Sequence, residues 1–193
     1  AQLIMHTEPK DPHGQDLGHI VKQLGLDSDR QVLFSTQKIP LEQMGTFYRI
    51  ADVTVNISDA EGFGLATLES LSCGTPIIAN MTGGLQEQVV GPEGENGVAI
   101  FPSSKAVIGS QQVPYIYEDR ISKESFISAL DKMYFIDDKV RRDLGKQGHR
   151  HVRENYSFEN FEKQWVDTML EVHENFGSWP TKAYSSIVFK EVA

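Results

Sequence analysis

Residues 51–84 read ADVTVNISDAEGFGLATLESLSCGTPIIANMTGG, and this stretch decides the expected fold. The apolar run Asp52–Ile57 predicts a strand, and after a loop with two glycines Gly64–Cys73 predicts a short helix. Gly74 follows at the position where helices commonly end, and Pro76–Ala79 predicts the next strand. Because the connections are short and a helix separates the strands, the strands are expected to be parallel.

The rest of the chain continues this alternation of strands and helices. Short apolar strands between helices are typical of a parallel sheet that is covered on both faces. The sequence therefore predicts an α/β fold that ends in several helices. Further strands are expected at Ala1–Thr7, Gln31–Ser35 and Gly97–Phe101, and further helices at 16–24, 40–50, 85–90, 122–135, 138–155 and 157–176.

Two regions depart from the alternation. Pro102–Arg120 is predicted to be a long polar loop, and the pattern is lost from Gly177 to Ala193. Residues 1–176 are therefore expected to form one domain and residues 177–193 an irregular tail. The last helix is expected to begin at Ser157 as its cap and to bury Phe161, Trp165, Thr168 and Met169.

Composition excludes several classes of function. The formal net charge is −9, whereas a nucleic-acid binder usually carries a basic face. The charge also disfavours binding to anionic lipid, so membrane contact is not indicated. The single cysteine, Cys73, rules out an internal disulfide and suits a reducing compartment such as the cytoplasm. Since the first residues already resemble the middle of a strand, the chain is expected to be a fragment of a longer protein.

The loop before the Gly64–Cys73 helix is a candidate site for an anion. In an open parallel sheet, ligands bind beyond the carboxyl ends of the strands. The backbone N–H groups of Phe63, Gly64 and Leu65 are expected to lie at the start of the helix, which attracts phosphate. Gly62 and Gly64 allow a ligand to approach the backbone closely.

Two carboxylates flank this anion site. Glu69 lies about five residues into the helix, roughly 7–8 Å from its start, and suits a pair of sugar hydroxyls. Glu61 lies in the loop, on the other side of the phosphate position, and also suits hydroxyls. A ligand with hydroxyls on both sides of a phosphate is a nucleotide sugar. The alternative is that neither glutamate binds a ligand. Glu61 would then be an ordinary acid in a loop, and Glu69 an ordinary solvated residue of the helix.

The segment EGFGLATLESLSCGTPIIANMTGGLQEQV resembles the hallmark segment of retaining GT-B glycosyltransferases. This group includes sucrose synthases, glycogen synthases and mannosyltransferases of family 4. The similarity extends to YRIADVTVNIS before the segment and to LGKQGHRHVRENYSFENFEKQW after it. It implies the Rossmann-like, carboxyl-terminal domain of a GT-B enzyme, which binds the donor substrate.

The resemblance also implies a role for each candidate residue. Glu61 would be the catalytic residue that binds the transferred sugar, and Glu69 would bind the ribose hydroxyls. The backbone from Gly62 to Leu65 would hold the sugar and the diphosphate. Ser35 and Thr36 would border the base, and the helix with Trp165 would return toward the partner domain.

The reaction implied is transfer of a hexose-type sugar from a nucleoside diphosphate to a glycan, lipid or protein, with retention of configuration. No metal or other cofactor is implied. The chain departs from the family in one respect. In the family, an Arg and a Lys near the first strand and helix of this domain also bind the diphosphate. This chain has no such segment, since Lys10 and Lys22 are not in that context. The first strand and the acceptor-binding domain are likewise expected to lie outside this chain, so the piece should not catalyse alone.

Two other functions remain open at this stage. One is a sugar-nucleotide-binding module that keeps the fold and has lost catalysis, although the intact pair of glutamates argues against it. The other is a dinucleotide oxidoreductase, because Gly62–Thr67 nearly matches G-x-G-x-x-G/A. Thr67 replaces the third glycine and Asn80 stands where an acidic residue would bind ribose, so this second function is disfavoured.

Overall fold

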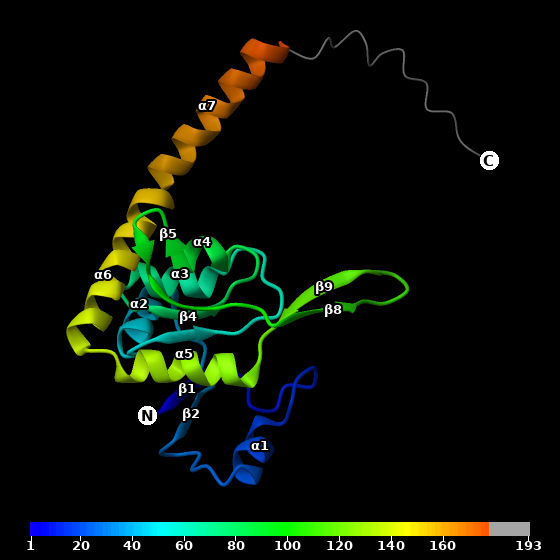
Figure 1. Cartoon of the computed structure of the whole chain (residues 1–193), viewed down its shortest axis with the longest axis vertical. Helices are drawn as coiled ribbons and strands as arrows, with labels where there is room; N and C mark the ends of the chain where they lie inside the picture. Colours follow the sequence, from blue (N-terminus) through cyan, green and yellow to red (C-terminus); the bar gives the residue numbers. More distant parts are fainter. Residues whose placement is uncertain (178–193) are drawn as a thin grey trace. The chain divides into compact units, whose positions relative to one another are not determined.

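The computed structural model describes residues 1–177, which divide into two compact units at Met44 and Gly45. Figure 1 shows the order of the elements along the chain. They are β1 (Leu3–His6), α1 (Leu17–Gln23), β2 (Val32–Ser35), α2 (Leu41–Arg49), β3 (Thr54–Asn56), α3 (Leu65–Ser72), β4 (Ile77–Asn80), α4 (Leu85–Val89), β5 (Val90–Gly91), β6 (Gly94–Glu95), β7 (Gly97–Ile100), β8 (Ser104–Ile108), β9 (Ile116–Arg120), α5 (Lys123–Phe135), α6 (Asp138–Asn155) and α7 (Phe158–Phe176).

The first unit contains a pair of parallel strands and helix α1. β1 and β2 pair in parallel, with Leu3 opposite Val32. α1 begins after Asp16, whose Oδ1 accepts a hydrogen bond from the His19 backbone N–H at 2.9 Å. Within residues 1–44 only Val21 and Val32 have buried side chains, so the unit has a small core.

The second unit is built around a parallel sheet of three strands in the order β3–β4–β7. The central strand β4 is buried along its whole length, which confirms the prediction of a doubly covered strand. Side chains of α3 and α4 pack on Ile77 and Ala79, while Ala129 and Met133 of α5 pack around Ile78. Figure 1 shows α3 and α4 on one side of the sheet and α5 on the other.

The prediction of a long loop at Pro102–Arg120 is wrong. Residues Ser104–Ile108 and Ile116–Arg120 form an antiparallel hairpin, with Val107 opposite Tyr117. Figure 1 shows β8 and β9 projecting away from the body of the second unit. The β-branched residues on both strands favour this pairing, and they outweigh the polar residues at the turn.

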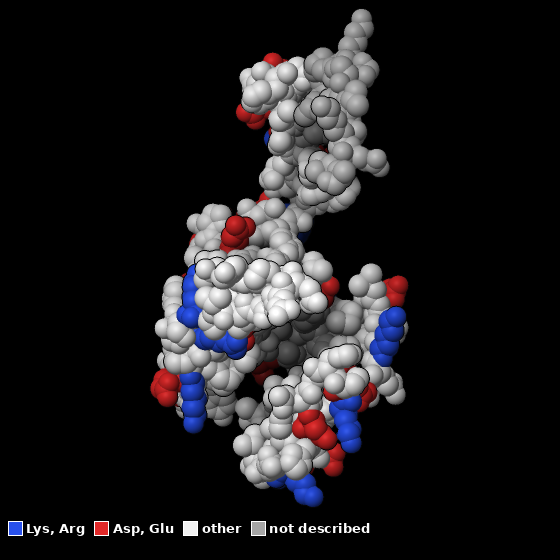
Figure 2. All heavy atoms as spheres, turned by 90° about the vertical axis from the view of Figure 1, so that its right-hand side faces the viewer, with Lys and Arg blue, Asp and Glu red and all other residues white. Residues whose placement is uncertain are grey.

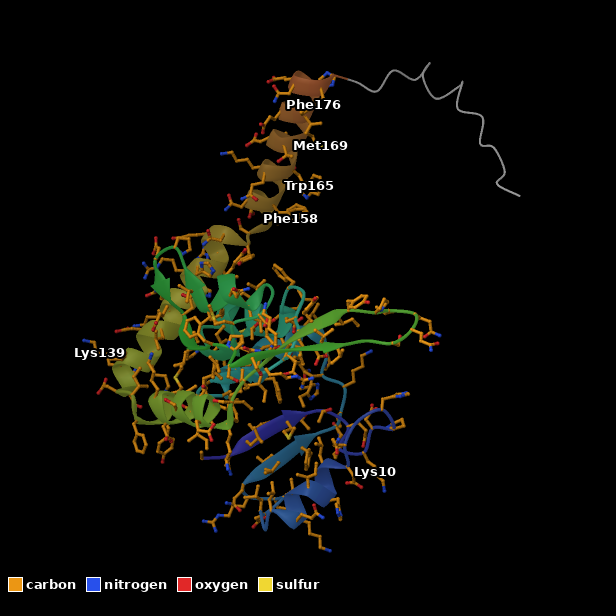
Figure 3. All side chains as sticks on the ribbon, turned by 45° about the vertical axis from the view of Figure 1, so that its right-hand side comes forward. Lys10, Lys139, Phe158, Trp165, Met169 and Phe176 are labelled. Carbon is orange, nitrogen blue, oxygen red and sulfur yellow. The ribbon has the colours of Figure 1, made fainter. Side chains whose placement is uncertain are left out.

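The predicted burial on the last helix is also wrong. α7 begins after Ser157, whose Oγ accepts a hydrogen bond from the Asn160 N–H at 3.2 Å, so the predicted cap is confirmed. However, α7 has no buried residue, and the side chain of Trp165 is 54% exposed. Figure 3 shows Phe158, Trp165, Met169 and Phe176 along a helix that stands away from the sheet. Periodicity predicts an apolar face, but it does not say what covers that face.

The surface carries both signs of charge. On the face seen in Figure 2, Lys and Arg lie among Asp and Glu, and most of that face is uncharged. None of the helices described in residues 1–177 is long and apolar enough to span a membrane. The predicted tail lies outside the described residues, except for Gly177.

Candidate functional site

The carboxyl ends of β3, β4 and β7 lie at one edge of the sheet because the three strands are parallel. The segments that follow them are residues 58–64, residues 81–84 and the β8–β9 hairpin. We call residues 58–64 the Glu61 loop. By the general rule for open parallel sheets, this is the edge at which a ligand binds.

The Glu61 loop is held through its backbone carbonyl groups. Each of four carbonyl oxygens accepts a hydrogen bond from a different segment, so the loop is fixed on several sides. The Ser58 oxygen accepts from Asn80 Nδ2 at 2.9 Å, the Asp59 oxygen from Asp119 N at 2.7 Å, the Gly62 oxygen from Gly84 N at 2.9 Å, and the Phe63 oxygen from Gln88 Nε2 at 2.6 Å.

The backbone N–H groups where the same loop joins α3 differ from these carbonyl groups in having no partner within the described residues. Within residues 1–177, those of Phe63, Gly64 and Leu65 donate no hydrogen bond to the protein. These groups lie at the start of α3, where the helix dipole is positive. Four carbonyl oxygens of the loop are therefore occupied, while the three N–H groups at the start of α3 are available, which is the arrangement that an anion requires.

Gly64 has a conformation and surroundings that require glycine. Its φ is +86°, a left-handed value that side chains rarely adopt. A Cβ there would overlap Leu85 Cδ2 and would lie 2.9 Å from Thr67 Oγ1. Thr67 Oγ1 in turn lies 2.6 Å from Gln88 Oε1, and both residues are fully buried. The start of α3 is thus packed directly against α4.

The loop after β4 meets the Glu61 loop backbone to backbone. A Cβ on Gly83 would overlap the carbonyl oxygen of Glu61, and one on Gly84 would lie 2.6 Å from the carbonyl oxygen of Phe63. No side chain fits between these two loops. The two glycines therefore set how closely the loops that follow β3 and β4 approach each other.

Glu61 and Glu69 lie on either side of the start of α3, as the sequence predicts from their spacing. Both are partly buried. Within residues 1–177 no hydrogen bond or ion pair to the Glu61 carboxylate is present, whereas Glu69 Oε2 accepts a hydrogen bond from Tyr48 Oη at 2.8 Å. Burial and the hydrogen bond to Glu69 raise the pKa of Tyr48 above its ordinary value.

Sequence reasoning did not identify Tyr48 or Gln88 as parts of the site. Tyr48 orients Glu69 from α2, and Gln88 reaches the Glu61 loop from α4. A buried glutamine in an otherwise apolar helix face is an unusual feature, and it is the one indication of this role that the sequence of residues 85–89 offers.

The side chain of Phe63 packs against the end of α6. Its ring makes an edge contact with Tyr156, with ring centres 5.7 Å apart. Both rings line an open hollow of about 940 Å³ between α4 and the junction of α6 and α7. Neither Glu61 nor Glu69 lines this hollow, so it shares Phe63 with the anion site and neither of the two carboxylates.

Ser35 and Thr36 belong to the first unit. Ser35 ends β2, and its Oγ lies 3.0 Å from His6 Nδ1. Thr36 is the next residue along the chain. Their expected role at the base stays a prediction, as do the roles of the other candidate residues. Among residues 1–177 no group of three His, Cys, Asp or Glu side chains is placed to hold a metal ion.

Comparisons with known proteins give the family. The family model described as glycosyl transferases group 1 matches residues 17–148. The D-inositol 3-phosphate glycosyltransferase of Corynebacterium urealyticum is 30% identical over 151 residues, which cover 78% of this chain and 30% of that protein. The chain thus spans about a third of the length of this curated relative.

Two solved structures share the fold. Sucrose-phosphate synthase from Thermosynechococcus elongatus aligns with a TM-score of 0.64 and 25% identity, covering 90% of this chain and 38% of that one. The C-terminal domain of a glycosyl transferase group 1 family protein from Francisella tularensis aligns with a TM-score of 0.54 and 27% identity, covering 74% and 62%. The chain therefore belongs to the glycosyl transferases group 1, as a carboxyl-terminal, donor-binding domain of the GT-B fold.

Proposed function

We propose that the chain binds a nucleoside-diphosphate sugar and forms the donor half of an enzyme that transfers a hexose-type sugar with retention of configuration. The observation that carries this proposal is the state of the Glu61 loop. Four of its carbonyl groups accept hydrogen bonds within the protein, while the N–H groups of Phe63, Gly64 and Leu65 are available between two carboxylates. A diphosphate flanked by a ribose and a sugar matches that order of groups.

Each residue then has a distinct task. The N–H groups at the start of α3 bind the diphosphate and stabilise the negative charge that develops on the leaving nucleoside diphosphate. Glu69, held by Tyr48, accepts hydrogen bonds from the ribose hydroxyls. Glu61 accepts hydrogen bonds from the hydroxyls of the transferred sugar and positions its anomeric carbon.

The acceptor is proposed to be a glycan, lipid or protein, bound by a domain outside this chain. The proposal includes no metal cofactor. Transfer that persists in excess chelator would support that part of it, and transfer that stops and returns on addition of Mg²⁺ or Mn²⁺ would contradict it.

Calorimetric titration of the natural full-length protein with UDP, GDP and ADP, and with their glucose and mannose derivatives, tests the proposal. We expect one nucleotide to bind and Glu69→Gln to weaken it about 10- to 100-fold, because a charge-assisted hydrogen bond contributes about 1.5–3 kcal/mol. Glu61→Gln is expected to weaken the nucleotide sugar more than the bare nucleotide.

Glu124→Gln is the matched control, since Glu124 is an exposed acid in the first turn of α5. It should leave all affinities unchanged. Failure of all three nucleotides and their sugars to bind would overturn the proposal. Binding without any transfer would instead favour a sugar-nucleotide-binding module.

A further inference from the structure

Asp119, at the base of the β8–β9 hairpin, is bonded to both loops of the site. Its Oδ2 accepts a hydrogen bond from Thr82 Oγ1 at 2.8 Å, in the segment after β4. Its backbone N–H donates to the Asp59 oxygen at 2.7 Å, in the Glu61 loop. Its backbone oxygen accepts from Asn80 Nδ2 at 3.2 Å. One residue of the hairpin therefore connects the loops that follow β3 and β4.

Arg120, the next residue, adds a second connection to the same loop. Its guanidinium lies 2.6 Å from the Asp59 carboxylate and also pairs with Glu118. Its backbone oxygen accepts a hydrogen bond from Ser103 N at 2.8 Å, which joins the two ends of the hairpin. Asp59 is thus held through its backbone by Asp119 and through its side chain by Arg120.

The Asp119 side chain is also placed as an internal group rather than a surface acid. It is 18% exposed, and its Oδ1 lies 3.6 Å from Lys105 Nζ on the opposite strand. A carboxylate that is largely withdrawn from water needs such partners, so its bond to Thr82 is expected to be kept rather than exchanged with solvent.

We propose that Asp119 and Arg120 are positioning residues for Glu61. Asp59 lies two residues before Glu61 in the sequence, so a shift of Asp59 is passed to Glu61 within about 7 Å of chain. On its other side the loop is fixed by the Gly84 N–H and by Gln88. The hairpin therefore restrains the side of the loop that Gly84 and Gln88 do not hold. In this way it controls the distance between the Glu61 carboxylate and the sugar. The proposal rests on the proposed function.

A positioning role predicts a separation between the two ends of the donor. Glu69 is held by Tyr48 and lies on α3, so the ribose contact does not pass through the hairpin. Loss of the Asp119 carboxylate, which holds Thr82, or of the Arg120 guanidinium, which holds Asp59, should therefore leave the affinity for the bare nucleoside diphosphate within about twofold. The nucleotide sugar gains affinity over the bare nucleotide from its sugar. The same loss should reduce that gain about tenfold, which corresponds to about 1.4 kcal/mol. A role in stability alone would not separate these two affinities.

The experiment compares Asp119→Ala, Asp119→Asn, Thr82→Val and Arg120→Gln in the natural full-length protein, with circular dichroism as a check of folding. Dissociation constants are measured for the bare nucleotide and for its sugar. Asp119→Asn keeps an oxygen that can accept from Thr82, so it should restore most of the sugar affinity. Thr82→Val removes the same hydrogen bond from the other side and should resemble Asp119→Ala. Gln112→Ala, at the exposed tip of the hairpin, is the control without effect.

The outcomes are distinguishable. Equal losses of nucleotide and sugar affinity in folded Asp119→Ala, Thr82→Val and Arg120→Gln, or no loss in any of them, would overturn the positioning role while the proposed function stands. Absence of nucleotide binding by the unaltered protein would overturn the proposed function and this role with it. If Asp119→Ala does not fold, Thr82→Val decides the question, because it changes volume little and leaves the ion pairs of the hairpin intact.

Discussion

Gly64 is the residue on which the geometry of the Glu61 loop depends most directly. Gly64→Ala is expected to lower the free energy of unfolding by about 2–4 kcal/mol, because it adds left-handed strain to an overlap with Leu85. Urea unfolding followed by circular dichroism measures this. Gly62→Ala is the matched control, since no atom lies within 4 Å of a Cβ built there. A similar loss of unfolding free energy in both variants would show that neither the left-handed φ nor the contact with Leu85 makes position 64 special.

At the scale of single residues, the sequence predicts positions better than partners. The positions of Glu61 and Glu69 around two glycines are predicted correctly, with Glu61 in the loop before α3 and Glu69 within the helix. The hydrogen bond from Tyr48 to Glu69 could not be predicted, because it joins residues 21 positions apart in the sequence. The bond from Asp119 to Thr82 was hidden for the same reason, with a separation of 37.

At the scale of elements, the helices and the buried strands follow from local patterns. β4 reads as a continuous apolar run and is central, and the caps at Asp16 and Ser157 form as their residue types predict. The β8–β9 hairpin is not predicted because its strands, SKAVI and IYEDR, lack the alternation of polar and apolar residues that indicates a half-buried strand. Its pairing depends on contacts across the hairpin, which periodicity along one strand does not reveal.

The apolar face of α7 leads to a prediction at this same scale. Phe161, Trp165 and Met169 are each more than half exposed, so the 193-residue chain should bind a hydrophobic dye such as ANS. Replacing all three with Gln should reduce the dye fluorescence severalfold and leave the unfolding midpoint of the sheet unchanged. The control replaces the exposed acids Glu162 and Asp167 with Gln and Asn. A large fall in the unfolding midpoint with the triple variant would show that this face is packed against the protein.

For the whole molecule, the two units differ in how much each buries. Residues 1–44 bury Val21 and Val32, whereas β4 and its neighbours in the second unit form two clusters of fully or nearly fully buried side chains. Native-state hydrogen exchange should therefore show amides of β1 and β2 opening at lower free energy than those of β4. Val32→Ala should speed exchange in the first unit and leave β4 unchanged. Equal protection of β1 and β4 would contradict this expectation.

The α/β class and the family also belong to this scale, and both were predictable. They depend on the order of elements and on one segment of sequence, which are local properties. The division at Met44 and Gly45 was not predicted, because it depends on which strands pair, and strand pairing is a long-range property.

The backbone contact between Gly83–Gly84 and the Glu61 loop has a consequence for how such a site can change over generations. Where two main chains touch without a side chain between them, a point mutation offers no small adjustment, since any larger residue displaces both loops. The hairpin side of the loop is held in part by the side chain of Arg120, and the carboxylate of Asp119 holds Thr82; these two side chains can be exchanged one at a time. Under the proposed function, a change in sugar preference would therefore arise from substitutions in the hairpin, while the two glycines stay constant.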